Sequence, residues 1–304
     1  MSSTTYNPAN YVSYGPDTNC TLAVCPLDAS VLGYRPAPAA SGIFLAFISL
    51  SMIIHAVQGI VWRHTLRSFA IPIIIGCIDE IIGYAGRVVL YNNPFSFNGF
   101  IIQIVCITTA PVFICASIYV TLARTIEYMD AGLARFHPKY FYWFFIPCDI
   151  VSLVFQAAGG ALSSITSGGN QTGVNLSLFG LAFQVFTLAI FIGFAGDYLV
   201  RYFVASHDGK EAEIRAAPRT RLRIFLVFLT AAVIFILVRC IYRIDELSDG
   251  YTGPMIRKEG LFYGLESVMI TLALLCLNVS HPGFGLKHEA SSLNFQMADV
   301  SSSA

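Results

Sequence analysis

The chain has 304 residues, of which 56% are hydrophobic and only 12% are charged. A soluble globular domain carries about 25% charged residues, so this composition excludes that class and indicates a polytopic membrane protein. The formal net charge is zero and no run of five or more basic residues occurs, so we expect no nucleic-acid partner.

The N-terminal segment, residues 1–40, is polar and rich in Pro, Ser, Asn and Tyr. It has no basic stretch followed by an apolar core, so we expect no cleavable signal peptide. Asn19 begins an N-glycosylation sequon, and Cys20 and Cys25 lie close behind it. An oxidising compartment favours a disulfide between these thiols and a reducing one keeps them free, and the sequence leaves both alternatives open.

Seven apolar segments follow, and each is long enough to cross a bilayer as a helix, which takes about 20 residues. They lie at 41–62, 69–90, 99–123, 140–162, 175–198, 222–243 and 261–280. We therefore predict an all-α fold with seven transmembrane helices in a membrane domain of residues 41–285. Residues 286–304 would then form a short cytoplasmic tail.

The second segment carries Asp79, Glu80 and Arg87 among its apolar residues. A charge in the middle of a membrane costs roughly 2.5–3.5 kcal/mol on insertion scales, so a helix with only a structural role has no reason to keep three. Glu80 and Arg87 are seven residues apart and share one helix face. That face has to point at partners inside a helix bundle.

Two acidic residues are candidate proton sites near the middle of the membrane. Asp79 belongs to the second segment, and Asp149 is the only charged residue of the fourth. A lone acid within a span can carry a proton or pair with a polar neighbour, and both alternatives stay open for Asp149. Gln156 and Gln184 also lie within their spans and are expected to hydrogen-bond between helices.

The sixth and seventh segments add charges near one membrane boundary. Arg239, Arg243 and Glu246 follow one helix face, and Glu259 and Glu266 open the next helix. These charges form either a set of salt bridges that locks helices two, six and seven together or a polar pocket for a lipid headgroup. Arg243 and Glu246 are expected to pair locally, which leaves Glu259 or Glu266 as the carboxylate without a basic partner.

The orientation follows from the distribution of lysine and arginine. Twelve of them lie in the first, third and fifth connections and the tail, three lie on the opposite side, and three lie within the membrane. Because cytoplasmic loops are enriched in basic residues, the N-terminus is predicted outside and the C-terminus in the cytoplasm. The sequons at Asn170 and Asn175 then lie on the same side as Asn19.

The motifs of several enzyme classes are missing from the sequence. There is neither a P-loop motif nor a G-x-S-x-G nucleophile motif. His55 is the only histidine within an apolar segment, whereas a zinc site needs several ligands. We therefore expect a protein without enzymatic activity, without a cofactor and without a metal.

Five of the segments carry polar motifs of fixed spacing. They are Glu80-x-x-Gly83-Tyr84-x-x-Arg87 in the second; Ala110-Pro111, Ala116-x-x-Tyr119 and Arg124 in the third; Asp149, Gln156 and Gly159-Gly160 in the fourth; Arg239-x-x-Tyr242-Arg243-x-x-Glu246, Gly250, Gly253, Glu259, Tyr263 and His281-Pro282-Gly283 in the sixth and seventh. Together they resemble the fungal Rta-like family of lipid-translocating exporters, which includes sphingoid long-chain-base exporters and aminocholesterol-resistance proteins. The resemblance covers residues 34–285, and Glu266 departs from it because the family commonly has Asp there.

The resemblance implies an exporter in the plasma membrane that moves amphipathic lipids, such as sphingoid long-chain bases, or related toxic amphiphiles. Its partners would be membrane lipids and the amphipathic substrate, and the oligomeric state stays open. The alternative is a seven-helix receptor or stress sensor of lipid or drug signals. Against it, Arg124 is followed by Thr-Ile-Glu, so the acidic-Arg-Tyr triplet of common receptors is missing, and the seventh segment lacks Asn-Pro-x-x-Tyr.

Overall fold

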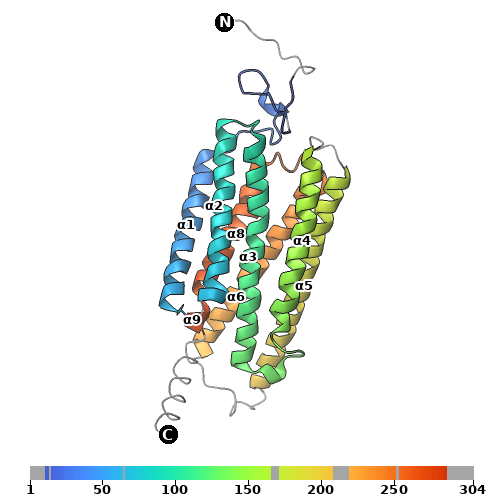
Figure 1. The fold of residues 1–304 in the computed structure, drawn as a ribbon. Coiled ribbons are helices and arrows are strands. Elements are labelled where there is room, and N and C mark those ends of the chain that lie inside the picture. Colours follow the sequence, from blue (N-terminus) through green and yellow to red (C-terminus); the bar gives the residue numbers. More distant parts are fainter. Residues whose placement is uncertain are drawn as a thin grey trace, which may run out of the picture.

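The protein is a bundle of long helices (Figure 1). The structure is a computed structural model that describes residues 11–13, 15–63, 66–165, 171–207, 219–250 and 253–285, and within these ranges it contains no strand. The α-helices are α1 (Pro38–Val61), α2 (Ile71–Asn92), α3 (Phe97–Met129), α4 (Tyr140–Ile165), α5 (Gln171–His207), α6 (Arg219–Ser248), α7 (Glu259–Leu261), α8 (Val268–Val279) and α9 (Pro282–Gly285). Shorter 3-10 and π-helical elements are η2 (Leu27–Ala29), η4 (Leu66–Ala70), η5 (Ala131–Leu133) and η7 (Phe262–Ser267). The all-α prediction is confirmed.

Six helical stretches in the described ranges have the length and apolarity of membrane spans. They are α1, α3, α4, α5, α6 and the continuous run from α7 to α9, Glu259–Gly285. The 22-residue helix α2 is not among them, because Asp79, Glu80 and Arg87 give it three charged residues in its apolar stretch. Figure 1 nevertheless shows α2 inside the bundle, between α1 and α3.

Glycines allow two pairs of helices to approach closely. A Cβ added to Gly86 on α2 would lie 2.9 Å from the backbone nitrogen of Gln103 on α3. A Cβ added to Gly159 on α4 would lie 2.5 Å from the carbonyl oxygen of Gly173 on α5. Small residues bring helix backbones together in membranes in this way. The α2–α3 and α4–α5 pairs are therefore joined along their backbones.

The final span contains a π-helical segment. Residues Phe262–Ser267 follow α7 with π-helical hydrogen bonding, and α8 continues directly at Val268. Such single π-turns inside α-helices are frequent at functional sites. The segment includes Glu266, so the turn determines how this carboxylate enters the bundle.

The N-terminal segment covers one end of the bundle. Cys20 and Cys25 form a disulfide with a Cα–Cα distance of 5.6 Å, and Phe95 packs against them. This resolves the open alternative between disulfide and free thiols in favour of the disulfide. Val31 and Leu32 are buried in an apolar cluster with residues of α2, α3, α5 and α6.

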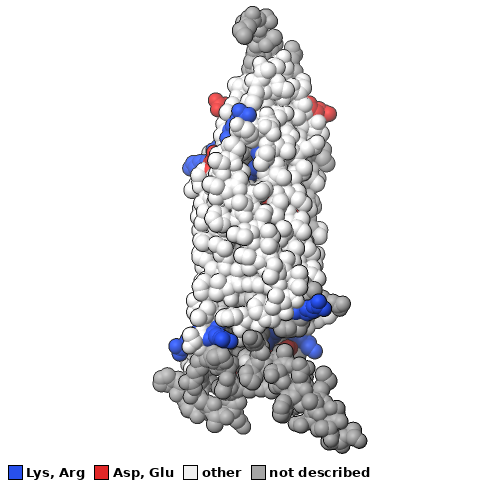
Figure 2. Space-filling model, turned by 90° about the vertical axis from the view of Figure 1, so that its left-hand side faces the viewer, with Lys and Arg blue, Asp and Glu red and all other residues white. Residues whose placement is uncertain are grey.

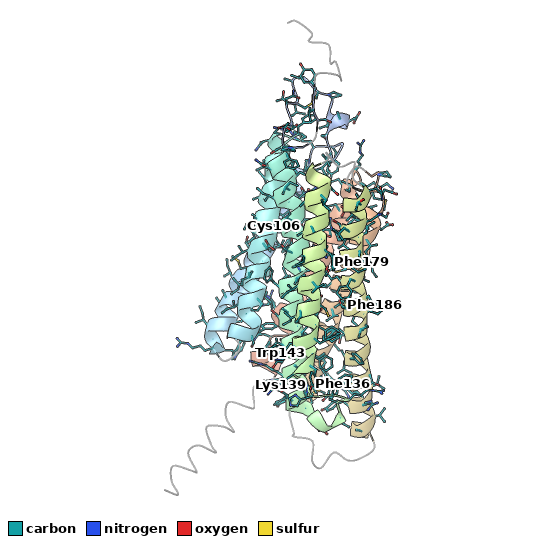
Figure 3. The ribbon with its side chains drawn as sticks, turned by 45° about the vertical axis from the view of Figure 1, so that its right-hand side comes forward. Cys106, Phe136, Lys139, Trp143, Phe179 and Phe186 are labelled. Carbon is teal, nitrogen blue, oxygen red and sulfur yellow. A yellow bond between two sulfur atoms is a disulfide. The ribbon has the colours of Figure 1, made fainter. Side chains whose placement is uncertain are left out.

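The outer surface of the bundle has the character of a lipid-facing protein. Figure 2 shows a broad uncharged belt between two ends that carry charged side chains. On another side of the bundle, Phe179 and Phe186 of α5 are exposed as well (Figure 3). Lys139 and Trp143, at the end opposite the N-terminus, are both exposed and close together in the same view. Tryptophan and lysine are typical of a membrane–water interface, so this end marks a membrane boundary.

Candidate functional site

A buried charge group connects α2, α6 and η7. Arg239 of α6 forms an ion pair with Glu266 of η7, and its Nη2 atom lies 3.9 Å from Oε1 of Glu80 on α2. It also donates a hydrogen bond to the carbonyl oxygen of Ile107 on α3. The side chains of Arg239, Glu80 and Glu266 are only 2%, 1% and 1% exposed. One guanidinium thus serves two carboxylates in the interior of the protein.

A second pair lies one turn further along α6. Arg243 pairs with Glu246 at i,i+3, as expected from their spacing, and donates a 3.1 Å hydrogen bond to the hydroxyl of Thr108 on α3. Tyr242 donates a 3.4 Å hydrogen bond to the other oxygen of Glu246. This pair therefore connects α6 to α3 and has equal numbers of positive and negative charges.

The third pair lies beneath the N-terminal segment. Arg87 of α2 is 3.6 Å from Glu259, whose side chain is 27% exposed. Its guanidinium donates a 3.3 Å hydrogen bond to the hydroxyl of Tyr34 and lies 4.0 Å above the ring of Phe262. Burial raises the pKa of Tyr34, which the neighbouring positive charge of Arg87 partly opposes. Glu259 also accepts a 2.7 Å hydrogen bond from the backbone of Ala37, so this pair ties α2 to the start of α1.

The arrangement differs from the sequence-based pairing in one respect. Neither Glu259 nor Glu266 lacks a basic partner, because each lies in an ion pair with an arginine. The carboxylate with the weakest pairing is Glu80, whose buried Oε1 atom is 3.9 Å from Arg239 and has no hydrogen-bond partner among the described residues. The sequence cannot show this, because the register of α2 against α6 and η7 decides which carboxylate lies nearest Arg239.

The charge cluster encloses little free space between Arg87 and Arg243. The void beside Arg87 and Arg243 has a volume of about 10 Å³. A water molecule alone needs roughly 10–15 Å³, so a lipid headgroup does not fit in this void. The three arginines and their carboxylates thus form a polar core that holds α2, α3, α6 and η7 together.

A larger cleft lies between α3, α4, α5 and α6, in the half of the bundle nearer the N-terminus. Its volume is about 230 Å³, approaching the roughly 300 Å³ at which small-molecule sites begin. Its walls are mainly aliphatic, with the aromatic ring of Phe100 and a few polar side chains: Thr108, Thr109, Gln156, Ser177 and Arg243. Exposed Val105 and Ala157 belong to the lining, so the cleft opens at the lipid-facing surface.

The cleft was not predicted from the sequence. Three small residues of α4, Ala157, Gly160 and Ala161, line it. A signal was present in Thr108 and Thr109, two adjacent hydroxyls in a span without charged residues. Gln156, at the cleft wall, donates a 3.1 Å hydrogen bond to Gln184 of α5 and also reaches Ser152.

The two candidate proton sites lie in separate environments. Asp79 is partly buried and accepts a hydrogen bond from Thr109, which lines the cleft. It also interacts with Cys106 of α3, which lies in the half of the bundle nearer the N-terminus (Figure 3). Asp149 is 1% exposed and accepts a 2.9 Å hydrogen bond from Tyr119. Among the described residues neither aspartate forms an ion pair, and the structure does not bring them together.

The remaining predicted positions concern glycosylation and metal binding. Asn175 is exposed at the start of α5, at the same end of the bundle as Asn19. Asn170 lies outside the described residues. Within the described ranges no group of three or more His, Cys, Asp or Glu side chains could hold a metal ion.

The helices, the uncharged belt and the buried ion pairs define a multi-pass membrane protein with a cleft open to the lipid. The model of the RTA1 like protein family matches residues 73–289, so the chain belongs to the RTA1-like family. This confirms the family resemblance found in the sequence.

Several yeast proteins are similar to most of the chain. The Sphingoid long-chain base transporter RSB1 of Saccharomyces cerevisiae is 31% identical over 272 residues, which are 80% of this chain and 70% of that protein. Protein RTM1 of the same species is 33% identical over 70% of this chain and 67% of its own. Protoporphyrin uptake protein 1, also from S. cerevisiae, is 33% identical over 69% of this chain and 67% of its own. No solved structure gives a significant match.

Proposed function

We propose that this protein moves amphipathic lipids with a cationic amine headgroup, such as sphingoid long-chain bases, across or out of the plasma membrane. The observation that carries the proposal is the lipid-facing cleft with a carboxylate, Asp79, hydrogen-bonded to its wall. The similarity to a yeast sphingoid long-chain base transporter supports it. Another relative is named for protoporphyrin uptake, so the relatives differ in substrate. The substrate of this protein therefore has to be inferred from its own residues.

The proposed topology has seven spans and counts α2 among them. Its 22 residues reach about 33 Å at 1.5 Å per residue, enough for a hydrocarbon core of about 30 Å. Glu80 and Arg87 are buried against other helices, whereas Ile71, Ile75 and Ile78 are exposed on the opposite side. The helix therefore buries Glu80 and Arg87 in the bundle and presents apolar side chains to lipid, as an intramembrane charge requires.

In this topology the N-terminus lies outside, the membrane domain covers residues 41–285, and the C-terminus is cytoplasmic. Basic side chains gather at the end opposite the N-terminal segment (Figure 2), which supports a cytoplasmic assignment for that end. Asn19 and Asn175 at the opposite end would then be accessible to glycosylation, and export would run toward the N-terminal side.

The chemistry of the cleft suits a long-chain amine. Its apolar walls can take an alkyl chain from the bilayer without exposing it to water. Asp79 has no basic partner among the described residues, so an ammonium group would supply the missing counter-ion. Hydroxyl groups next to the amine would find Thr109 and Gln156 as hydrogen-bond partners at the wall.

The test is transport of a labelled sphingoid base in proteoliposomes. Ala157→Phe fills the cleft, whereas Ala158→Phe changes an exposed neighbour that does not line it. We expect at least a tenfold loss of transport for Ala157→Phe and wild-type transport for Ala158→Phe. Equal transport by both variants would exclude the cleft as the lipid site. Saturable binding of the base without any transport by the wild-type protein would instead indicate the receptor or sensor alternative.

The headgroup preference has its own test in the same vesicles. Asp79→Asn removes the charge while keeping the size and the ability to accept from Thr109. We expect it to lower transport of a sphingoid base much more than transport of an uncharged long-chain diol. An equal loss for both lipids would mean that Asp79 does not recognise the amine.

A further inference from the structure

The three buried arginines of the charge cluster are paired with four carboxylates, so the cluster as a whole has one carboxylate in excess. Arg243 and Glu246 balance each other, as do Arg87 and Glu259. Arg239 alone faces both Glu80 and Glu266. With both carboxylates ionised, this innermost group would carry a net negative charge.

Burial makes that net charge costly. Glu80 and Glu266 are each 1% exposed, so water does not screen them. Two carboxylates that share one buried site do not both ionise readily, because the second charge is repelled by the first. The Oε1 atom of Glu80 also has no hydrogen-bond donor in the described ranges, so no dipole of these residues stabilises an anion there.

We propose that Glu80 and Glu266 share one exchangeable proton beside Arg239. With one proton bound, the group is neutral: a single carboxylate pairs with the guanidinium, and the other is a carboxylic acid. The proton comes from water on one side of the membrane and returns to water, so no other reactant is needed. This site differs from the candidate proton sites Asp79 and Asp149, neither of which forms an ion pair within the described part of the chain.

The groups that face the pair come from several elements. On α2 they are Cys77, Asp79 and Tyr84, on α3 Cys106, and on α6 Cys240, Tyr242, Arg243 and Glu246 in addition to Arg239. The α3 backbone contributes the carbonyl oxygen of Ile107, which occupies one N–H of Arg239. None of the cations among these is free to balance a second carboxylate, because Arg243 is already paired with Glu246.

The pair is connected to the cleft by one short path. Arg239 holds the carbonyl of Ile107, and the next residue, Thr108, lines the cleft and accepts from Arg243. Glu266 lies in the π-helical segment, whose hydrogen bonding differs from that of the adjoining α-helix. We infer that loss or uptake of the proton changes the contacts of Arg239 and so the position of the α3 cleft wall; this coupling to lipid movement rests on the proposed function.

Proton binding can be tested without any lipid substrate. Infrared spectroscopy of the purified full-length protein detects the carbonyl stretch of a protonated carboxylic acid and its shift in heavy water. We expect a band at neutral pH that is lost in Glu80→Gln and in Glu266→Gln, because each variant leaves one carboxylate for one arginine. Asp149→Asn serves as the control for the other buried carboxyl, and Asp197→Asn for an exposed, ion-paired one. A band that survives in both glutamine variants would overturn the shared proton.

The coupling of proton binding to lipid transport is tested by imposing a pH gradient on proteoliposomes loaded with sphingoid base. Wild-type transport should respond to the gradient, and Glu80→Gln transport should lose that response. A Glu80→Gln variant that follows the gradient as the wild type does would overturn the coupling. If wild-type protein shows the infrared band but moves no lipid, the proposed function fails while the proton site stands. Gel filtration of each variant confirms that it is folded.

Discussion

Replacement of Arg239 by alanine tests whether the buried charge group holds the bundle together. The change removes the ion-pair partner of Glu266, the nearest cation to Glu80 and the donor to the carbonyl of Ile107. Breaking a buried pair by removing one member costs about 3–5 kcal/mol, because the other member stays buried without compensation. Folded proteins have free energies of unfolding of about 5–15 kcal/mol, so this is a large part of the total.

The assay is thermal unfolding in detergent followed by fluorescence-detected gel filtration, together with abundance at the cell surface. Arg201→Ala is the matched control, because Arg201 also forms an ion pair, 3.0 Å from Asp197, but its side chain is 43% exposed. Solvent screens such a pair, so its loss should change stability little. Arg239→Ala should lower both the unfolding temperature and the abundance far more than Arg201→Ala.

A compensated variant separates charge from packing. Arg239→Met combined with Glu80→Gln and Glu266→Gln removes every charge of the group while keeping similar volumes. It should recover most of the stability that Arg239→Ala loses, because no unpaired charge remains buried. The reasoning is refuted if Arg239→Ala is as stable as Arg201→Ala, or if the compensated variant is less stable than Arg239→Ala.

Three further predictions concern packing, the N-terminal segment and topology. Gly86→Ala should cost about 1–3 kcal/mol in unfolding free energy because the new Cβ meets the α3 backbone, whereas Gly193→Ala, with open space around it, should cost nothing; equal melting temperatures would contradict this. Cys20→Ser should lower the stability of the N-terminal segment by about 2 kcal/mol on the loop-entropy model, measured as faster proteolysis of that segment, and unchanged proteolysis would argue against it. A cysteine that replaces Asn175 should react with an impermeant maleimide on intact cells, and one that replaces Lys139 should react only after permeabilisation; the reverse pattern would mean that the protein has the opposite orientation in the membrane.

Local spacing in the sequence was enough to predict some contacts of the charge cluster. Arg243 and Glu246 lie three residues apart on one helix, so their pairing needs no knowledge of the tertiary structure. The family resemblance and the apolar segments likewise predicted the helical fold. The helices α3 and α5 extend beyond the predicted apolar segments, to Met129 and His207, because a helix propagates into polar residues once it has formed.

The remaining contacts depend on how distant helices are placed against one another. Glu80 and Glu266 are nearly 190 positions apart, and only the packing of α2 on η7 decides that they share Arg239. The cleft likewise arises between α3 and α4, and its wall residues Thr109 and Ala157 carry no pattern that predicts their proximity. A hydropathy pattern indicates which side of a helix avoids lipid, but it does not indicate which other helix that side packs against.

The close backbone contacts within the helix pairs have a mechanical consequence. Gly86 brings α2 onto α3 and Gly159 brings α4 onto α5, so sliding or separation within either pair would break contacts at van der Waals distance. The cleft lies between these two pairs, with α3 on one side and α4 on the other. We therefore expect each pair to move as a unit, so that the cleft would widen or narrow by movement of the α4–α5 pair relative to α2 and α3.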